Sequence, residues 1–327
     1  MDEGPRIAPD NEPMKTEAAK PTHVLVLGGG PDAERAVSLV SSAAVAAALA
    51  ARPDCLVTYE VVGELTDREL AAMPGEVVFP ALHGPWGEGG PLQDLLEAGG
   101  RPFVGCRAGA ARTAMDKVAS KLAASSAGIA TKPAAVFSAR DPGCPLPYPV
   151  VVKPVHEGSS VGVHFAPDAE AWKSTRARVC AELTEHPRRV YIVEEAVVGG
   201  RELTVGVLDG TPLDPIEIRP AVAFYDYDAK YHSDETQYTV APVLPTGITA
   251  AVQGAAALLF RAIGCRHLAR VDFLLDSSGR PWLLEINTMP GFTGHSLLPM
   301  AAAKAGLPFA ALCARLVEFA DRDGRLS

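Results

Sequence analysis

The strongest constraint on the fold is a β-hairpin pattern near the C-terminal end, at residues 268–287. In its first stretch, LARVDFLL, apolar residues alternate with Arg270 and Asp272, and in the second, RPWLLEIN, they alternate with Glu285 and Asn287. This period of two is typical of strands with one apolar face. The turn sequence DSSG lies between the stretches, so we expect the strands to pair and to gather the four polar side chains on one face of a sheet.

This face would carry two carboxylates, an amide oxygen and a guanidinium. The oxygens suit Mg²⁺, with phosphate oxygens filling the remaining coordination positions. For any single Asp or Glu, a solvated charge on the wet side of a hairpin is the better interpretation, but acidic residues are poor strand formers. Four polar residues at matched spacing, followed by the glycine-containing loop TMPGFTG, favour a metal and phosphate site.

Size and charge restrict the class of protein. A chain of 327 residues with 48% hydrophobic residues can bury a large core, and we expect two or three subdomains. The formal net charge of −9 argues against a nucleic-acid partner and against an anionic membrane surface. Six scattered cysteines without a C-x-x-C pair predict reduced thiols in a cytoplasmic protein. Residues 1–21 lack an apolar run, so we expect a disordered extension rather than a signal or membrane anchor.

A glycine turn joins the first expected strand, at 23–30, to the helix that follows. The sequence GGGPDA at 28–33 satisfies the dinucleotide pattern G-x-G-x-x-G/A, which makes a nicotinamide-dependent oxidoreductase a hypothesis from a different class. That class needs an acidic residue about 20 positions further on, at the tip of the next strand. Glu60 arrives late for this role, and glycine turns precede helices in many α/β folds.

Two polar residues follow expected strands and precede glycine-rich loops. His83 comes after VVFPAL, at the kind of strand end where open α/β sheets bind ligands; a local hydrogen bond explains it equally well. Lys153 ends an apolar strand before the loop HEGSSVG at 156–162. A point charge beside close backbone N–H groups suits a phosphate chain, although a Walker A motif is absent.

A Gly-Gly hinge and a long polar loop are the other candidate ligand contacts. The hinge is flanked by Glu194, Glu195 and Glu202. Its backbone groups suit an adenine edge and a carboxylate suits ribose hydroxyls, although solvated charge is the better interpretation of each residue alone. Residues 221–242 are dense in Tyr, Asp and Lys. Loops of this length are functional or disordered, and the aromatics argue against disorder, so we predict a closing lid.

Apolar periodicity in the rest of the chain predicts alternating strands and helices. We expect helices at about 33–51, 110–126, 167–186, 248–263, 295–305 and 308–320, and further strands at 129–137 and 148–155.

Eight segments together resemble the D-alanine:D-alanine ligases of the ATP-grasp superfamily. In order, they read GGGPDAERAVSL, ALHGPWGEGGPLQ, AMDKVASK, VVKPVHEGSSVGV, VEEAVVGGRELTVGVL, FYDYDAKYHSDETQY, RVDFLLD and LLEINTMPGFTGHSLLP. The resemblance runs from about residue 23 to the C-terminus. It implies an ATP-grasp fold of class α/β (α+β), in which ATP lies between the last two of three units. These units are a Rossmann-like α/β domain at 22–106, a central subdomain at 107–196 and a C-terminal subdomain at 197–327, after the extension at 1–21.

The resemblance also implies roles for individual residues. ATP would contact Lys117, Lys153, Gly158, Ser160, Glu194, Val197, Glu202, Phe224, Lys230 and Leu274. Two Mg²⁺ ions, for which Mn²⁺ can substitute, would be bound by Asp272, Glu285 and Asn287. The catalytic group would comprise Glu34, Ser159, Tyr231, Arg270 and Ser296. The amino-acid substrates would contact His83, Gly291 and Leu297.

The implied reaction joins two D-alanines through an acyl phosphate, with ATP, for peptidoglycan precursor synthesis. The partners would be small molecules, without nucleic acid or membrane, and the resemblance is compatible with a homodimer. Tyr231 in the lid favours a dipeptide product. A ligase for another amino acid or for a hydroxy acid acceptor is the alternative, and a non-catalytic ATP-binding protein is disfavoured because the metal and phosphate groups are all retained. Gly89, Glu195 and Gly294 depart from the family's usual residues.

Overall fold

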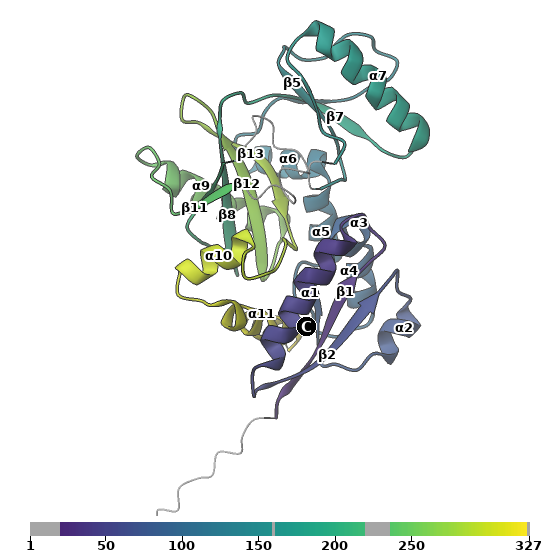
Figure 1. Ribbon diagram of the computed structural model, residues 1–327, viewed down its shortest axis with the longest axis vertical. Helices are drawn as coiled ribbons and strands as arrows, with labels where there is room; N and C mark the ends of the chain where they lie inside the picture. Colours follow the sequence, from purple (N-terminus) through teal and green to yellow (C-terminus); the bar gives the residue numbers. More distant parts are fainter. Residues whose placement is uncertain (1–19, 159–160, 220–235, 326–327) are drawn as a thin grey trace, which may run out of the picture.

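Three β-sheets follow one another along the chain in the computed structural model, which describes residues 20–158, 161–219 and 236–325. The N-terminal sheet lies at one end of the long axis and the central sheet, with its single long helix α7, at the other (Figure 1). The C-terminal sheet lies between them. The mixture of helices and strands agrees with the predicted class.

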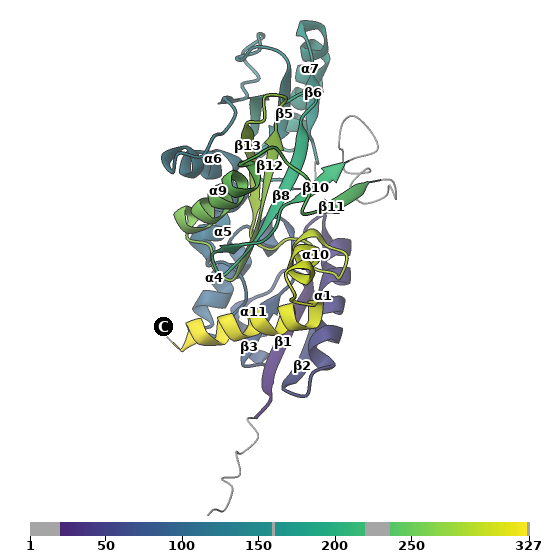
Figure 2. The ribbon, with the colours of Figure 1, turned by 90° about the vertical axis from the view of Figure 1, so that its left-hand side faces the viewer.

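The N-terminal sheet is parallel, and its central strand is buried on both faces. Its strands are β1 (Thr22–Gly29), β2 (Cys55–Val62) and β3 (Val77–Pro80), in the order β2-β1-β3, with helices α1 (Arg35–Ala50), α2 (Asp67–Ala72), α3 (Gly84–Gly87) and α4 (Pro91–Ala98). Val24 and Val26 pack in the core that contains α1 and α11 (Phe309–Gly324), while Leu25 and Leu27 pack in the core that contains α2 and α4. This double burial explains the uninterrupted apolar run of β1. Figure 2 shows α11 beside the N-terminal sheet, although it ends the chain.

The central sheet is antiparallel and covered on one face. Its strands are β4 (Ala134–Val136), β5 (Val150–Pro154), β6 (His164–Ala166) and β7 (Tyr191–Glu195), in the order β4-β7-β5-β6. Val150 and Val152 pack against Trp172 of α7 (Ala169–Glu185). Because side chains alternate along a strand, Val151 and Lys153 point to the opposite face, which α7 leaves uncovered.

The C-terminal sheet carries the predicted hairpin. Its strands are β8 (Arg201–Leu208), β9 (Thr211–Pro212), β10 (Ile216–Arg219), β11 (Gln237–Val240), β12 (Leu268–Leu275) and β13 (Pro281–Asn287), in the order β11-β10-β8-β12-β13 with β9 beside β8. The strands β12 and β13 pair antiparallel, with Arg270 opposite Asn287 and Asp272 opposite Glu285. The predicted pairing is therefore confirmed. The register shifts between Asp272 and Phe273, which lies opposite Leu283, so Leu283 and not Leu284 is buried behind the hairpin.

Helices from two parts of the chain cover one face of this sheet. They are α5 (Ala108–Met115), α6 (Lys117–Ser126) and α9 (Ile248–Ile263), and their apolar residues share one core with β8 and β12. The helix α10 (Leu297–Lys304) also contacts β8. The helices α5 and α6 belong to the predicted central subdomain at 107–196 but share a core with the C-terminal sheet. The domain boundaries at 106 and 196 stay a prediction.

Three predicted elements differ from the structure. The prediction of a single helix at 110–126 is wrong, because the helix is interrupted at Asp116. The Asp116 carboxylate accepts hydrogen bonds from the backbone N–H groups of Val118 at 2.8 Å and Ala119 at 3.0 Å and so caps a second helix. The strand at 129–137 is limited to β4. The end of the segment at 221–242 forms β11, because it pairs with β10.

The predictions for the lid and for the N-terminal extension concern residues that the structure mostly does not describe. The predicted lid lies mostly in 220–235, and the N-terminal extension mostly in 1–19, both outside the described residues. All six cysteines are free, and Cys265 and Cys313 are buried as expected. Within the described ranges no single helix is long and apolar enough to cross a membrane, although α10 and α11 together meet the length and composition test across a 100° bend.

Candidate active site

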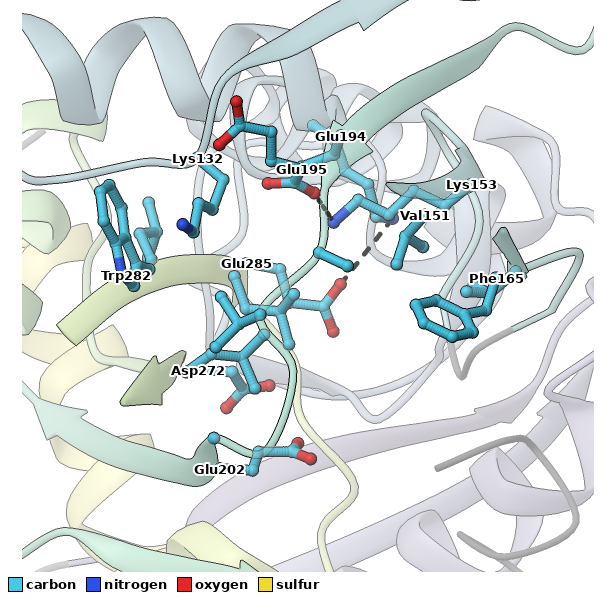
Figure 3. Close-up of a pocket in the computed structure, with 18 of the residues that line it drawn as sticks. Lys132, Val151, Lys153, Phe165, Glu194, Glu195, Glu202, Asp272, Trp282 and Glu285 are labelled. Atoms are coloured by element: carbon cyan, nitrogen blue, oxygen red, sulfur yellow. Dashed lines mark ion pairs between the residues drawn. The ribbon is translucent and has the colours of Figure 1, made fainter. Parts of the chain in front are cut away.

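A cavity of about 580 Å³ is lined by the uncovered face of the central sheet, the hinge after β7, and the β12–β13 hairpin. Figure 3 shows acidic and basic side chains facing one another across it. Nine of the predicted site residues line this cavity: Lys117, Lys153, Gly158, Glu194, Val197, Glu202, Asp272, Leu274 and Glu285. The structure thus brings together most of the residues predicted to contact nucleotide and metal.

Asp272 is held by three neighbouring side chains. Arg270 donates to it through Nε at 3.0 Å and Nη2 at 2.7 Å, a bidentate pair. Thr204, on the adjacent strand β8, donates to Oδ1 at 2.5 Å, and Nδ2 of Asn287 donates to Oδ2 at 3.2 Å. These contacts follow from the register, because residues 204, 272 and 285 lie opposite one another on β8, β12 and β13. The carboxylate is therefore fixed in position at the edge of the cavity.

Lys117 faces Glu285 from the first turn of α6. Its Nζ lies 3.8 Å from Oε2 of Glu285 and donates to the carbonyl oxygen of Glu157 at 2.5 Å. Burial lowers the pKa of the Lys117 ammonium; Glu285 opposes this effect and Lys153 adds to it. The break at Asp116 starts α6 at this point, so the helix cap determines where the lysine enters the cavity.

Glu194 links two buried lysines. One of its oxygens accepts from Lys121 of α6 and the other from Lys153 of β5, and all three side chains are less than a tenth exposed. Burial raises the pKa of Glu194, but the lysine charges and hydrogen bonds outweigh it, so the pKa lies below its ordinary value. Burial lowers the pKa of Lys121, against the effect of Glu194. A charged Lys121–Glu194–Lys153 cluster is therefore formed, in which Glu194 and Lys153 line the cavity.

An apolar wall and a stacked tryptophan complete the cavity. Val151, Phe165 and Leu274 line it beside the hinge. Two cations contact the ring of Trp282, with Nζ of Lys132 4.2 Å and Cζ of Arg280 4.1 Å from its centroid. Figure 3 shows Trp282 and Lys132 together on one side of the cavity. This combination of apolar surface and charged rim suits a flat, polar-edged ring.

His83 lies behind the hairpin and is buried. Its Nδ1 bonds the carbonyl oxygen of Met289 at 2.9 Å, so this nitrogen carries the proton, and Nε2 lies 3.4 Å from Oγ of Ser41. The hydroxyl of Ser41 in turn accepts from the backbone N–H of Phe292 at 3.1 Å. Burial lowers the pKa of His83, with Glu34 opposing the effect. His83 therefore contacts the loop after β13 as a neutral ring.

Glu88 holds the same loop from the other side of the Met289 peptide. Its oxygens accept from the backbone of Gly84 at 3.3 Å and of Met289 at 3.2 Å. Burial raises the pKa of Glu88 to about 8, with the negative charge of Glu34 adding to the effect. His83 and Glu88 thus fix the carbonyl and the N–H of one residue, two positions after Asn287.

The remaining predicted residues lie near the cavity, near the loop after β13, or outside the described residues. A side chain at Gly158 would place its Cβ 3.2 Å from Oε2 of Glu34, so the glycine permits this close approach. Ser296 accepts from the backbone of Thr293 at 3.0 Å, and Gly291 lies beside it. Leu297 begins α10. Five predicted residues fall outside the described ranges: Ser159, Ser160, Phe224, Lys230 and Tyr231.

The glycine turn at 28–30 is filled by its own helix. The N–H of Gly29 donates to Oγ of Ser38 at 2.9 Å, and a Cβ at Gly28 would overlap the Ser42 side chain. The N–H of Gly30 donates to the carbonyl oxygen of Val62 at 2.9 Å. These contacts occupy the backbone groups that a pyrophosphate would need, so the turn serves packing and the nicotinamide hypothesis loses its support.

Sequence reasoning missed five side chains that the structure places at the site. They are Glu88, Lys121, Lys132, Thr204 and Trp282. Two had a usable signal: Lys121 lies four residues after Lys117, on the same helix face, and Thr204 lies two residues after Glu202, on the same strand face. The others depend on contacts between distant segments.

The hairpin carries oxygen donors suited to a metal ion. Within the described ranges, no group of three or more His, Cys, Asp or Glu side chains is placed to hold one. The hairpin instead offers the carboxylates of Asp272 and Glu285 with the amide oxygen of Asn287. Hard oxygen donors in this number suit Mg²⁺, which keeps several other ligands from water and phosphate.

Solved structures with the same arrangement of sheets define the class. A D-alanine–D-alanine ligase from Bacillus anthracis complexed with ATP is similar, with a TM-score of 0.78 and 29% identity, covering 94% of this chain and 99% of that chain. The D-Ala:D-Ser ligase VanG from Enterococcus faecalis has a TM-score of 0.78 and 25% identity, covering 92% and 99%. The protein therefore has the ATP-grasp fold, as predicted.

Sequence comparison specifies the family within this class. The model of the D-ala D-ala ligase C-terminus matches residues 138–318. A D-alanine–D-alanine ligase from Anaeromyxobacter sp. (strain K) is 42% identical over 301 residues, which cover 90% of this chain and 96% of the relative. The chain belongs to the D-alanine–D-alanine ligase family, and the predicted enzyme class is confirmed.

Proposed function

We propose that this chain joins two D-alanine molecules to D-alanyl-D-alanine, with conversion of ATP to ADP and phosphate, for peptidoglycan precursor synthesis. One observation carries the proposal: the face formed by Asp272, Glu285 and Asn287 borders a cavity into which Lys117 and Lys153 also project. Opposed carboxylates and ammonium groups at this spacing suit the transfer of a phosphoryl group. The names of the relatives and of the similar structures support the choice of substrates.

The cavity provides separate places for the parts of ATP. Lys117 and Lys153 would contact the phosphates, as would the loop that contains Gly158 and Ser160. The apolar wall around Leu274 would hold the adenine, with Phe224 on its other side. Glu194 and the backbone near Val197 would contact the adenine edge, and Glu202 the ribose. The similar Bacillus anthracis structure is complexed with ATP, which supports ATP as the ligand of this cavity.

The hairpin would hold the Mg²⁺ ions. Asp272, Glu285 and Asn287 are the ligands in this proposal, and Nδ2 of Asn287 already donates to Asp272, which leaves its Oδ1 as the donor oxygen. When bound, the ions neutralise phosphate charge. Arg270 keeps Asp272 in place through two hydrogen bonds and would also offset the negative charge that develops on the reacting carbonyl oxygen.

The remaining predicted residues would bind and orient the amino acids. Glu34, with Ser159 and Tyr231, would orient the first D-alanine, and His83 would face its carboxylate. A carboxylate oxygen of the first D-alanine would attack the γ-phosphorus of ATP, and ADP would leave. The neutral amine of the second D-alanine, seated near Ser296 and Leu297 beside the Gly291 backbone, then attacks the acyl carbon. Phosphate leaves, and the amine loses a proton. The lid, with Lys230, would exclude water from the acyl phosphate.

Phosphate release tests the proposal. Purified protein is assayed with ATP, Mg²⁺ and D-alanine, and the dipeptide is identified by mass spectrometry. We expect D-alanine-dependent phosphate release, loss of this activity in Glu285→Ala, and retention in the matched control Glu318→Ala, whose carboxylate is 64% exposed on α11. If Glu285→Ala releases phosphate at the wild-type rate, the assignment of the site is wrong.

Two kinds of acceptor other than D-alanine are open to a direct test. The similarity to a D-Ala:D-Ser ligase makes D-serine a second candidate, and D-lactate represents the hydroxy acids. Competition between D-alanine and either acceptor, followed by product analysis, separates the cases. We also propose a cytoplasmic location and a homodimer, to be tested by cell fractionation and by light scattering.

A further inference from the structure

Lys121 contacts the cavity wall from behind. It is not among the described residues that line the cavity, whereas its partner Glu194 and the second lysine, Lys153, both are. The ammonium of Lys121 pairs with one carboxylate oxygen of Glu194 and also donates to the carbonyl oxygen of Lys132 at 3.2 Å. The three charged side chains come from α6, β5 and β7, and each is less than a tenth exposed.

Glu194 is paired with two buried lysines, one more than is needed to neutralise a single carboxylate. One buried carboxylate is neutralised by one ammonium, and a second buried ammonium adds desolvation cost. Lys153 is the lysine that reaches the cavity. A triphosphate in the cavity would compete with Glu194 for it, because both are anions that pair with the same ammonium. Without another cation, Glu194 would then be a buried and uncompensated charge.

We infer that Lys121 is a positioning residue that keeps Glu194 neutralised and fixed when Lys153 exchanges this carboxylate for a nucleotide phosphate. The two lysines bind different oxygens of the carboxylate, so one can leave while the other remains. Through its bond to the Lys132 carbonyl, Lys121 also ties Glu194 to the segment beside Trp282. The inference deepens the proposed function and rests on ATP being the ligand of this cavity.

Binding of ATP and Mg²⁺, without D-alanine, measures this role by calorimetry. In Lys121→Met we expect the Kd for ATP to rise by about 30-fold or more, the lower end of the loss for truncating one partner of a buried charge pair. Lys121→Arg keeps the charge and should bind more like the wild type than like Lys121→Met. The matched control is Lys173→Met, which removes a lysine that is 72% exposed on α7, and it should leave the Kd unchanged.

Proton uptake separates this role from a merely structural one. In Lys121→Met, a bound phosphate leaves Glu194 without a directly bonded ammonium, and only the more distant charge of Lys117 acts on it, so the carboxyl should take up a proton as ATP binds. The ratio of variant to wild-type Kd should then fall as the pH is lowered from 8 to 6, by up to about tenfold per pH unit. Titrations in buffers of different ionisation enthalpy count the protons directly.

The outcomes distinguish the inference from the function on which it rests. If the wild type does not bind ATP, the proposed function is wrong. If the wild type binds and Lys121→Met binds equally well, or binds more weakly without a pH dependence of the ratio, the inference is wrong. If Lys121→Met does not fold, the same change is made in Glu194→Gln, where it should weaken ATP binding by no more than about twofold because the two residues act as a unit. A larger loss there would overturn the inference.

Discussion

The buried His267 should make the stability of the fold depend on pH. Its Nδ1 accepts the backbone N–H of Gly105 at 3.1 Å, so the proton is on Nε2, which donates to Oδ2 of Asp323 at 3.0 Å. The side chain is completely buried. Burial lowers the pKa of His267 from 6.5 to about 4; the charge of Arg266 adds to this and Asp323 opposes it. The neutral ring of His267, just before β12, therefore bonds both Gly105, which precedes α5, and Asp323 of α11. Protonation of Nδ1 would break the bond to Gly105.

The sign and size of the effect follow from the two pKa values. Between pH 6.5 and 4 the unfolded chain binds a proton at this histidine that the folded chain does not, so stability falls as the pH falls. The contribution is fully present above the unfolded pKa and is lost as the pH passes the folded pKa. A shift of this size corresponds to about 3 kcal/mol.

The variant His267→Asn tests this reasoning. Asparagine does not titrate, tolerates the left-handed backbone at this position, where φ is 63°, and keeps an oxygen to accept from Gly105. Urea unfolding is followed at several pH values from 7.5 to 4. The variant should be less stable at neutral pH, and the deficit should shrink by about 3 kcal/mol towards pH 4. The control His186→Asn changes an exposed histidine. A deficit for His267→Asn that does not change with pH would refute the assignment of a neutral buried ring.

Substitutions at three further positions test the site and the residues that support it. Because the pKa of Glu88 is raised to about 8, its stabilising effect is present below its ordinary pKa and is lost as the pH rises through 8. The melting temperature of Glu88→Gln relative to wild type should therefore rise between pH 5 and 9, and a constant difference would contradict this. Thr204→Val removes the buried hydroxyl that donates to Asp272 at 2.5 Å; we expect about 2 kcal/mol lower stability in urea and a lower kcat, and an unchanged enzyme would count against the proposed metal face. Asp116→Ala removes the cap of α6 and should cost about 1 kcal/mol in urea unfolding, whereas Asp116→Asn should retain most of the stability.

The sequence by itself determined the hairpin and the residues that share its face. Side chains alternate along any strand, so the spacing of Arg270, Asp272, Glu285 and Asn287 is a local property that the printed sequence carries. Turn residues between two alternating stretches indicated the pairing, whereas the register, with Asp272 opposite Glu285 and a shift after Asp272, came from the structure. The order of the eight segments likewise indicated the family without any contact being known.

Only the tertiary structure decided which distant residues complete the site. The helix break at Asp116 depends on a side-chain cap that competes with the continuous apolar pattern around it. The Lys121–Glu194–Lys153 cluster unites three elements, and His83 bonds a carbonyl 206 residues away in the chain. Periodicity reports only the geometry of each element, whereas these contacts depend on how sheets and helices pack against one another. Burial, which produces the pKa shifts of Glu88 and His267, arises from that packing alone.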